Sequence, residues 1–342
     1  MLYQTVRSLL FKFDAEDAHR LALGSLDFAQ WSGVLPLLTS ASPNAPVDLM
    51  GLRFPNPVGL AAGMDKNGDY IDSLAALGFG FLELGTVTPR PQPGNPHPRL
   101  FRVPQASAII NRMGFNNKGV DHLVARLQAR REREPKRDCL VAANIGKNFD
   151  TPLENAADDY LICMRKVYAY SDYITVNVSS PNTKGLRKLQ GENELDQLLH
   201  TLKAEQQKLA DLHGRYVPFL VKIAPDLEDA AIAGVADLLL HHKIDGVIAT
   251  NTTLSRTGVA EFTHGNETGG MSGVPLHARA VEVVRLLRHA VGLEYPIIGV
   301  GGIMSAASAQ STVDAGANLV QIYSGFVYRG PSLVREIVEQ IK

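Results

Sequence analysis

Residues 57–87 have the sequence PVGLAAGMDKNGDYIDSLAALGFGFLELGTV, and this stretch decides the fold. An apolar run at Val58–Ala62 is followed by a helix-period segment at Gly68–Leu77 and by a second apolar run at Phe81–Val87. The Gly-Phe-Gly at 78–80 is a helix-stop signal before the second run. Two β-rich runs joined by a helical segment are typical of parallel strands with a helical crossover, so these residues predict a β-α-β unit.

The same alternation continues from this unit to the C-terminus. Further apolar runs lie at Leu140–Ile145, Tyr173–Val178, Pro218–Ala224, Gly246–Asn251, Pro296–Val300 and Leu319–Tyr323. Helix-period segments lie between them, for example at Val120–Arg133, Leu153–Tyr170, Glu194–Leu212, Glu228–His242 and Leu276–Ala290. Most of the runs are apolar throughout, as expected of strands that are covered on both faces. Eight such strands predict an α/β fold of the (β/α)8, or TIM-barrel, type.

Two regions lie outside this repeat. Thr88–Gly119 is rich in Pro, Gly and Asn, and we expect a long functional loop there. The first 45 residues predict two helices that are split near Phe13 and Asp14, and a hairpin VDLMGLRF follows, turning at Met50 and Gly51. Although the length would allow two globular domains, barrels of this size are common as one. We therefore predict an N-terminal helical extension, 1–45, and a barrel catalytic domain, 46–342.

Composition excludes several classes of protein. The chain has 342 residues, 45% of them hydrophobic and 20% charged, which is typical of a globular protein with a large core. Its net charge of -1 favours no nucleic acid partner. Cys139 and Cys163 form no disulfide framework, and no apolar run is long enough to span a bilayer or act as a signal peptide. The ten histidines show no ligand spacing, so we expect no metal site, and no GxSxG motif suggests a hydrolase.

Polar side chains follow the predicted strands, at the barrel end where active sites form. These strand-end residues are Lys66, Thr86, Asn144, Asn177, Ser180, Asn182, Lys222, Thr250, Asn251, Tyr323 and Ser324. Glycines in GVGGI and YSGF follow the last two strands, where barrels commonly bind a phosphate, although glycines can also serve only the tight turns. The glycine-rich loop TGGMSG, 268–273, adds to the same wall. A phosphate-bearing cofactor is therefore expected at this end of the barrel.

Neutral amides beside a lysine with apolar flanks suit a flat heterocycle rich in hydrogen-bonding groups, and a flavin and a pyrimidine both match. Lys222 would then stabilise negative charge on a reduced flavin, whereas the alternative is a surface ion pair. Ser180 is either catalytic or a turn-stabilising serine in the SSPN sequence. The residues alone leave both pairs of alternatives open.

Taken together, these motifs resemble the dihydroorotate dehydrogenase family, and in detail its membrane-associated, quinone-dependent class. The resemblance covers nearly the whole chain and rests on KNGDYIDSLAALGFGFLELGTVTPRPQPGNPHPRLFR, NRMGFNNKG, NVSSPNTKGLR, VKIAPD, IATNTT, GGMSG, GVGGI and QIYSGF. It implies that (S)-dihydroorotate is oxidised to orotate in de novo pyrimidine biosynthesis. One FMN per chain would accept the hydride, and a membrane quinone would be the final electron acceptor.

The resemblance also implies a role for individual residues. Ser180 corresponds to the catalytic base, a position that holds cysteine in the soluble classes. The implied FMN contacts are Ala62, Gly63, Lys66, Thr86, Asn144, Asn177, Lys222, Thr250, Gly273, Gly302, Tyr323 and Ser324. The implied substrate contacts are Lys66, Asn111, Arg112, Met113, Gly114, Phe115, Asn177, Asn182, Asn251 and Thr252.

The N-terminal extension has more apolar surface than packing on a barrel requires. Its apolar residues are Leu2, Val6, Leu9, Leu10, Phe13, Leu21, Leu23, Leu26, Phe28, Trp31, Val34, Leu35, Leu37 and Leu38. They either cap the barrel or form an interfacial membrane patch. The resemblance favours the membrane and implies quinone access past His19 and Arg102. We accordingly expect a peripheral protein on the cytoplasmic side of the cell (inner) membrane, a monomer with no obligate protein partner.

Two other functions compete with this one. The first is an FMN barrel that acts on another substrate, such as a 2-hydroxy acid oxidase or a dihydropyrimidine reductase. A hydroxy-acid oxidase needs a histidine base at a late strand end, and the sequence has none there. The second is a non-catalytic phosphate-binding barrel or membrane-tethered scaffold, which would leave Ser180, Lys66 and the amides without a role.

Overall fold

Eight parallel strands close into a barrel in the computed structural model, which describes residues 2–35, 44–133 and 138–341. The strand order around the barrel is β10-β12-β13-β3-β4-β7-β8-β9. The strands are β3 (Val58–Leu60), β4 (Phe81–Val87), β7 (Leu140–Ile145), β8 (Tyr173–Asn177), β9 (Phe219–Ile223), β10 (Gly246–Ala249), β12 (Ile297–Val300) and β13 (Leu319–Ile322). All eight lie within the predicted apolar runs, so the (β/α)8 prediction is confirmed.

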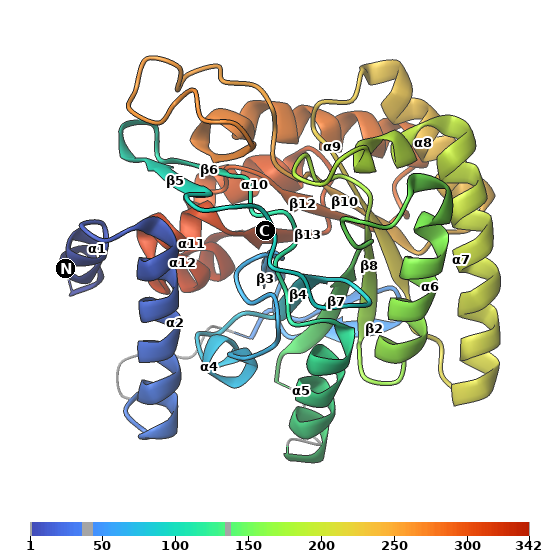
Figure 1. The fold of residues 1–342 in the computed structure, drawn as a ribbon, viewed down its shortest axis with the longest axis horizontal. Coiled ribbons are helices and arrows are strands. Elements are labelled where there is room, and N and C mark those ends of the chain that lie inside the picture. Colours follow the sequence, from blue (N-terminus) through green and yellow to red (C-terminus); the bar gives the residue numbers. More distant parts are fainter. Residues whose placement is uncertain (1, 36–43, 134–137, 342) are drawn as a thin grey trace.

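Helices cover the outside of the barrel (Figure 1). They are α4 (Ile71–Ala75), α5 (Val120–Arg133), α6 (Ala156–Val167), α7 (Glu192–His213), α8 (Asp229–His241), α9 (His277–Val291), α10 (Ala306–Asp314), α11 (Ser324–Arg329) and α12 (Ser332–Gln340). Short 3-10 turns are η1 (Pro104–Ala106), η2 (Leu153–Asn155), η3 (Leu186–Gln190) and η4 (Val274–Leu276). Each long helix buries one stripe: in α7, Leu195, Leu198, Leu199 and Leu202 are buried at helical spacing and pack into the main core.

The interior of the barrel is closed at the end where the strands begin. Because side chains alternate along a strand, the first residues of several strands, such as Phe81 and Tyr173, point inward and form one apolar cluster with Phe54. Phe54 ends a hairpin made of β1 (Val47–Leu49) and β2 (Leu52–Phe54). This hairpin turns as predicted at Met50 and Gly51, and it plugs the barrel and leaves its opposite end for the site.

A small antiparallel sheet lies where the sequence predicts only loops. Strands β5 (Leu100–Val103) and β6 (Ala108–Asn111) lie within segment 88–119, and β11 (Gly270–Gly273) lies within the glycine-rich segment 268–273. The sheet order is β11-β6-β5. The loop prediction was wrong here because each strand has only four residues, β11 is rich in glycine, and β11 pairs with β6 across a large sequence separation.

The N-terminal extension forms two helices, as predicted. They are α1 (Leu2–Leu10) and α2 (Ala15–Trp31), and Asp14 caps α2 by accepting from the backbone N–H groups of Glu16 and Asp17. Both helices lie at one edge of the molecule (Figure 1). The Tyr3 hydroxyl donates to the Val327 carbonyl at 2.7 Å and fastens α1 to α11. The predicted apolar positions Leu37 and Leu38 lie outside the described residues.

No helix in the described part of the chain combines the length and apolar character that crossing a bilayer requires.

Candidate active site

A cavity opens at the carboxyl ends of the barrel strands and contains about 980 Å³ of open space, part of it continuous with solvent. This size and position are typical of a small-molecule site in a barrel. Its walls include Ala62, Gly63, Lys66, Thr86, Asn111, Met113, Gly114, Phe115, Asn177, Ser180, Asn182, Lys222, Thr250, Asn251, Thr252, Gly302, Tyr323 and Ser324. Side chains from strands and loops far apart in sequence therefore meet in one space.

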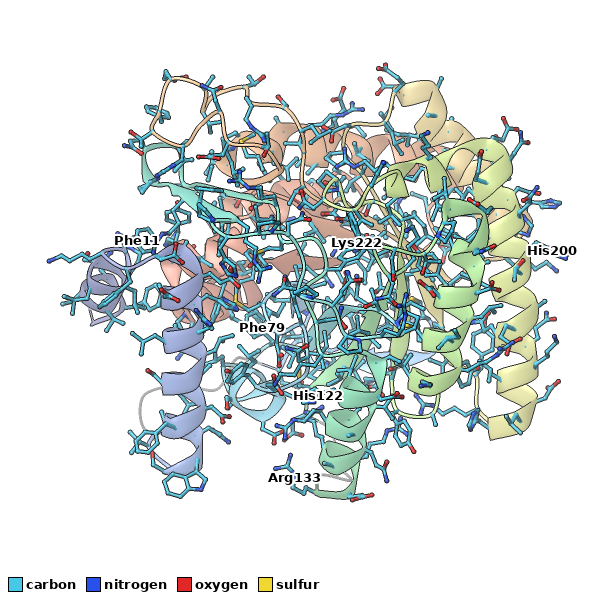
Figure 2. The ribbon with its side chains drawn as sticks, in the orientation of Figure 1. Phe11, Phe79, His122, Arg133, His200 and Lys222 are labelled. Atoms are coloured by element: carbon cyan, nitrogen blue, oxygen red, sulfur yellow. The ribbon has the colours of Figure 1, made fainter. Side chains whose placement is uncertain are left out.

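A buried carboxylate, Glu83, organises the floor of this cavity. It lies two residues beyond Phe81 on β4, so alternation directs it into the barrel one layer above the apolar cluster. The Nζ of Lys222 lies 3.1 Å from Glu83 Oε1, and both side chains are almost fully buried. Asn144 and Gln321 each donate to the same carboxylate at 2.6 Å. Figure 2 labels Lys222 in the interior of the molecule.

Above this floor, amide and hydroxyl groups are joined in one hydrogen-bonded wall. The hydroxyl of Thr86 donates to Asn144 Oδ1 at 2.5 Å and accepts from Asn177 Nδ2 at 2.9 Å. Asn251 Nδ2 donates to the hydroxyl of Ser179 at 3.0 Å, and that hydroxyl donates to Asn177 Oδ1 at 3.0 Å. Because these groups restrain one another, they present fixed donors and acceptors to a planar ring.

A glycine corner completes the cavity beside β12 and β13. Gly302 has a φ of 65°, and a Cβ there would lie 2.6 Å from the carbonyl oxygen of Gly273. Only glycine fits, and the backbone is left open to the cavity. The hydroxyls of Ser272 and Ser324 are 2.8 Å apart at the same wall. Exposed backbone and hydroxyl groups are a donor set that suits a phosphate.

Ser180 lies just beyond the end of β8 and is 6% exposed. Its Oγ accepts a hydrogen bond from the backbone N–H of Asn182 at 3.2 Å. The side chain of Asn182 in turn donates to the backbone carbonyl of Asn111 at 3.0 Å. The serine loop is thereby tied to the segment 111–115 across the cavity.

Lys66 enters the same cavity from the loop after β3. Its ammonium donates to the side-chain oxygen of Asn116. Burial, with a smaller contribution from the Arg99 charge, lowers the pKa of Lys66 to about 7, and Glu16 opposes the shift. The lysine therefore changes charge near neutral pH, and an anionic ligand would favour its protonated form.

A second cavity, of about 670 Å³, lies between the N-terminal helices and the barrel. Its lining is largely apolar and includes His19 and Arg102. The guanidinium of Arg102 lies 4.5 Å above the ring of Phe11, which Figure 2 labels beside the N-terminal helices. Burial lowers the pKa of His19 to about 4, so this imidazole is neutral at pH 7. Tyr323 lines both cavities and therefore lies between them.

Comparison with known proteins identifies the family. The model of the family described as dihydroorotate dehydrogenase matches residues 44–342. The chain belongs to the dihydroorotate dehydrogenase family. It is 58% identical over 340 residues to a protein of Paraburkholderia phymatum named dihydroorotate dehydrogenase (quinone), with 99% of this chain and 97% of that protein covered. A protein of the same name from Nitrosomonas eutropha is 59% identical over 337 residues, with 98% and 96% covered.

A solved structure supports the same assignment. The crystal structure of DHODH in complex with ferulenol from Eimeria tenella superposes with a TM-score of 0.87 at 38% identity and covers 96% of this chain and 90% of that chain. The ligand-free form from the same organism gives a TM-score of 0.86 at 38% identity, with 94% and 93% covered. The similarity therefore extends over the barrel and most of the N-terminal extension.

Within this dihydroorotate dehydrogenase fold, most of the predicted flavin and substrate contacts converge on the main cavity with Ser180, and three of them do not line it. Asn144 is fully buried behind Thr86, and Gly273 lies behind Gly302. Arg112 is directed away, since its guanidinium pairs with Glu267 at 2.8 Å and stacks on Phe101. Its assignment as a substrate contact stays a prediction, which the direction of its side chain does not favour.

The sequence analysis did not predict two residues of this dihydroorotate dehydrogenase site, Glu83 and Gln321. Each is the single strongly polar side chain in the inner layer of an otherwise apolar strand, in FLELGTV and in LVQI. A polar residue within an apolar strand could have identified both positions, because a polar side chain inside a barrel needs a hydrogen-bonding partner. The buried ion pair of Glu16 with Arg99 was also missed, and no local pattern connects two residues so far apart.

Proposed function

We propose that this chain is a quinone-linked dihydroorotate dehydrogenase. It oxidises (S)-dihydroorotate to orotate with FMN as the hydride acceptor and a membrane quinone as the final electron acceptor, in de novo pyrimidine biosynthesis. The observation that carries this proposal is the near-complete coverage at 58% identity by relatives named dihydroorotate dehydrogenase (quinone). In the same chain Ser180, Lys66 and Lys222 line one cavity at the mouth of the barrel.

The residues of the main cavity fit one FMN. The amide wall offers donors and acceptors for the edge of the ring, Lys222 offers a cation beside it, and the glycine corner offers backbone and hydroxyl groups for the phosphate. When bound, FMN supplies the acceptor for hydride from C6 of dihydroorotate. We assign its binding to Ala62, Gly63, Lys66, Thr86, Asn144, Asn177, Lys222, Thr250, Gly273, Gly302, Tyr323 and Ser324.

Ser180 is the base in this proposal: its Oγ takes the proton from C5 of dihydroorotate while its own hydroxyl proton passes to a bound water or a neighbouring hydroxyl. A serine hydroxyl is a weak base, so the protein must lower the cost of negative charge on Oγ. The backbone N–H of Asn182 already donates to that oxygen. Lys66 offers a cation to the substrate carboxylate. We assign substrate binding to Lys66, Asn111, Met113, Gly114, Phe115, Asn177, Asn182, Asn251 and Thr252, and Arg112 stays in this set only as a prediction from the sequence, because its guanidinium pairs with Glu267.

The experiment that tests this function compares electron acceptors. Purified FMN-containing protein is mixed anaerobically with dihydroorotate, and flavin absorbance is followed. The oxidised spectrum should bleach and then return when ubiquinone or menaquinone is added. Turnover is measured in parallel with NAD and fumarate. Turnover with only NAD or fumarate contradicts the quinone assignment, and a flavin that dihydroorotate does not bleach contradicts the whole proposal.

We further infer that residues 1–45 admit quinone and that residues 46–342 form the catalytic domain. The second cavity supports this division. Residues of α1 and α2 form one side of it, and Tyr323, which also lines the main cavity, forms part of the other side. A largely apolar lining suits a quinone ring and its tail. His19 and Arg102 are the polar groups that we assign to quinone access.

Ala22→Trp should obstruct this path. Ala22 lines the second cavity, so the larger side chain fills space that the quinone needs. We expect the KM for quinone to rise about 5- to 100-fold, while anaerobic bleaching by dihydroorotate is unchanged. Leu21→Trp is the control, since Leu21 is the preceding residue and is 51% exposed. Equal KM values for quinone in the two variants would contradict the path.

The exposed apolar face of the extension supports peripheral membrane binding. Phe13, Phe28 and Trp31 are more than half exposed, with Trp31 at 81%, and Lys12 and Arg20 lie nearby in sequence. Such a face is typical of a helix that lies in the membrane interface. We propose that this monomer, with no obligate protein partner, sits on the cytoplasmic side of the cell (inner) membrane.

The double variant Phe28→Ser/Trp31→Ser should lose affinity for phosphatidylglycerol-containing vesicles. Each aromatic side chain is worth roughly 1.5–3 kcal/mol when fully buried, so we expect a loss of tenfold or more in vesicle flotation assays. The matched control is Leu212→Ser/Leu293→Ser, which removes similarly exposed apolar residues from α7 and from the turn after α9. If both doubles float like the parent protein, the extension is not the membrane-binding surface.

A further inference from the structure

We propose that Glu16, on helix α2 of the N-terminal extension, is a positioning residue for the oxidation of dihydroorotate. Through Arg99 it holds the segment 111–115 against the Ser180 loop, so the extension supports the substrate side of the enzyme as well as quinone access. The inference rests on the proposed function, since it concerns the same substrate cavity.

The first link is a buried ion pair. Glu16 is 8% exposed and Arg99 is 6% exposed. Arg99 Nη2 lies 2.8 Å from Glu16 Oε1, and Arg99 Nε lies 3.0 Å from Oε2. Two parallel bonds of this kind hold a guanidinium in one plane and one orientation. His97 adds a contact of 3.2 Å to Glu16 Oε2. The ion pair therefore fixes where the remaining nitrogen of Arg99 points.

The second link runs from Arg99 into the loop after β4. Arg99 Nη1 donates to the carbonyl oxygens of Pro93 and Asn95 at 2.6 and 2.8 Å. Its own backbone carbonyl accepts from the N–H of Arg112 at 2.9 Å. All three guanidinium nitrogens are thus engaged, two by α2 and one by the loop. Loss of the Glu16 carboxylate would leave a buried cation free to turn away from these carbonyls.

The third link reaches the cavity through Asn95. Its side-chain amide donates to the carbonyl oxygen of Arg112 at 2.8 Å and to that of Asn182 at 3.3 Å. Its backbone N–H donates to the carbonyl oxygen of Met113 at 3.0 Å. Asn182 is the residue whose N–H donates to Ser180 Oγ. One asparagine therefore joins the substrate segment to the catalytic loop.

The backbone conformation of segment 111–115 depends on contacts with neighbouring segments. Gly114 has a φ of 73°, and Phe115 follows with a φ of 55°, which is the left-handed region. A bulky residue adopts that conformation only where neighbouring contacts hold it there. A Cβ at Gly114 would lie 2.8–3.0 Å from the side chain of Asn95, so the two segments are in close contact. A shift at Asn95 is therefore expected to move the cavity wall.

Separate measurement of the two half-reactions in FMN-loaded Glu16→Gln tests the proposal. Anaerobic stopped-flow bleaching should show an apparent Kd for dihydroorotate raised about 10- to 100-fold, because small displacements of a positioning group cost that much. Reoxidation of the chemically reduced enzyme by a short-chain quinone should stay within about twofold of the parent rate, since Glu16 does not line the second cavity. A merely structural defect would slow both half-reactions.

Asp17→Asn is the matched control. Asp17 is the next residue of α2, its side chain is 59% exposed, and it pairs with Arg20 on the surface. Both half-reactions should keep the parent values in this variant. If Glu16→Gln does not fold, Arg99→Lys provides the second test, because it keeps the charge but cannot bind Glu16 and both carbonyls together. It should also raise the Kd for dihydroorotate.

Either of two results overturns the proposal: an unchanged Kd for dihydroorotate in the folded variant, or an equal loss in both half-reactions. Failure of the proposed function is a different outcome, because the parent protein itself would then not be bleached by dihydroorotate.

Discussion

Ser180→Ala should abolish reduction of the flavin by dihydroorotate and leave FMN bound. Removing a general base typically costs 10²- to 10⁴-fold in rate, and we expect a loss of about that size in the anaerobic bleaching rate. The cofactor should stay, because Ser180 is one of many groups around the cavity, whereas the Lys222, amide and glycine positions are unaltered. Flavin absorbance per protein reports the cofactor, and stopped-flow spectroscopy reports the rate.

Ser171→Ala is the control for this variant, because it makes the same substitution at the other end of β8. Ser171 precedes Tyr173, the first residue of β8, and is fully buried at the barrel end opposite the site. Removing its hydroxyl should leave the bleaching rate within about twofold, since no group of the cavity is removed. A Ser180→Ala variant that bleaches as fast as the parent would exclude Ser180 as the base. Such a result would also reopen the rival function of a phosphate-binding scaffold.

Glu83→Gln should give the largest loss of stability. Three donors, from Lys222, Asn144 and Gln321, converge on the Glu83 carboxylate. An amide offers them a single acceptor oxygen and adds two hydrogens, and the ammonium of Lys222 keeps no counter-charge. Breaking a buried ion pair from one side costs about 3–5 kcal/mol, and we expect the free energy of unfolding to fall by about that much. Urea denaturation of the cofactor-free protein, followed by circular dichroism, measures it.

The surface pair of Arg335 with Glu339, 2.7 Å apart, supplies the comparison. Glu339→Gln removes the same charge at an exposed position and should change the free energy of unfolding by less than about 1 kcal/mol. The double variant Glu83→Gln/Lys222→Met should recover part of the loss, because it removes the unpaired cation as well. If Glu83→Gln and Glu339→Gln unfold at the same urea concentration, Glu83 does not organise the barrel floor.

The sequence by itself determined the (β/α)8 fold and which end of the barrel carries the site. The eight strands and the helices between them follow from local hydrophobic periodicity, as in Phe81–Val87 and Val120–Arg133, where prediction and structure agree at both ends. Because the carboxyl ends of parallel barrel strands all face the same way, residues such as Lys66 and Ser180 could be assigned to one cavity without coordinates. Closure of the barrel then brings the carboxyl ends of all eight strands together around one cavity.

Only the tertiary structure decided which groups become partners. Glu16 and Arg99 are 83 residues apart, and Gln321 lies 238 residues from Glu83, yet each pair is in direct contact. The sheet of β5, β6 and β11 also joins segments that looked like independent loops. The physical reason is that periodicity reports which face of an element is buried, whereas hydrogen bonds and ion pairs depend on where closure of the whole barrel brings each side chain.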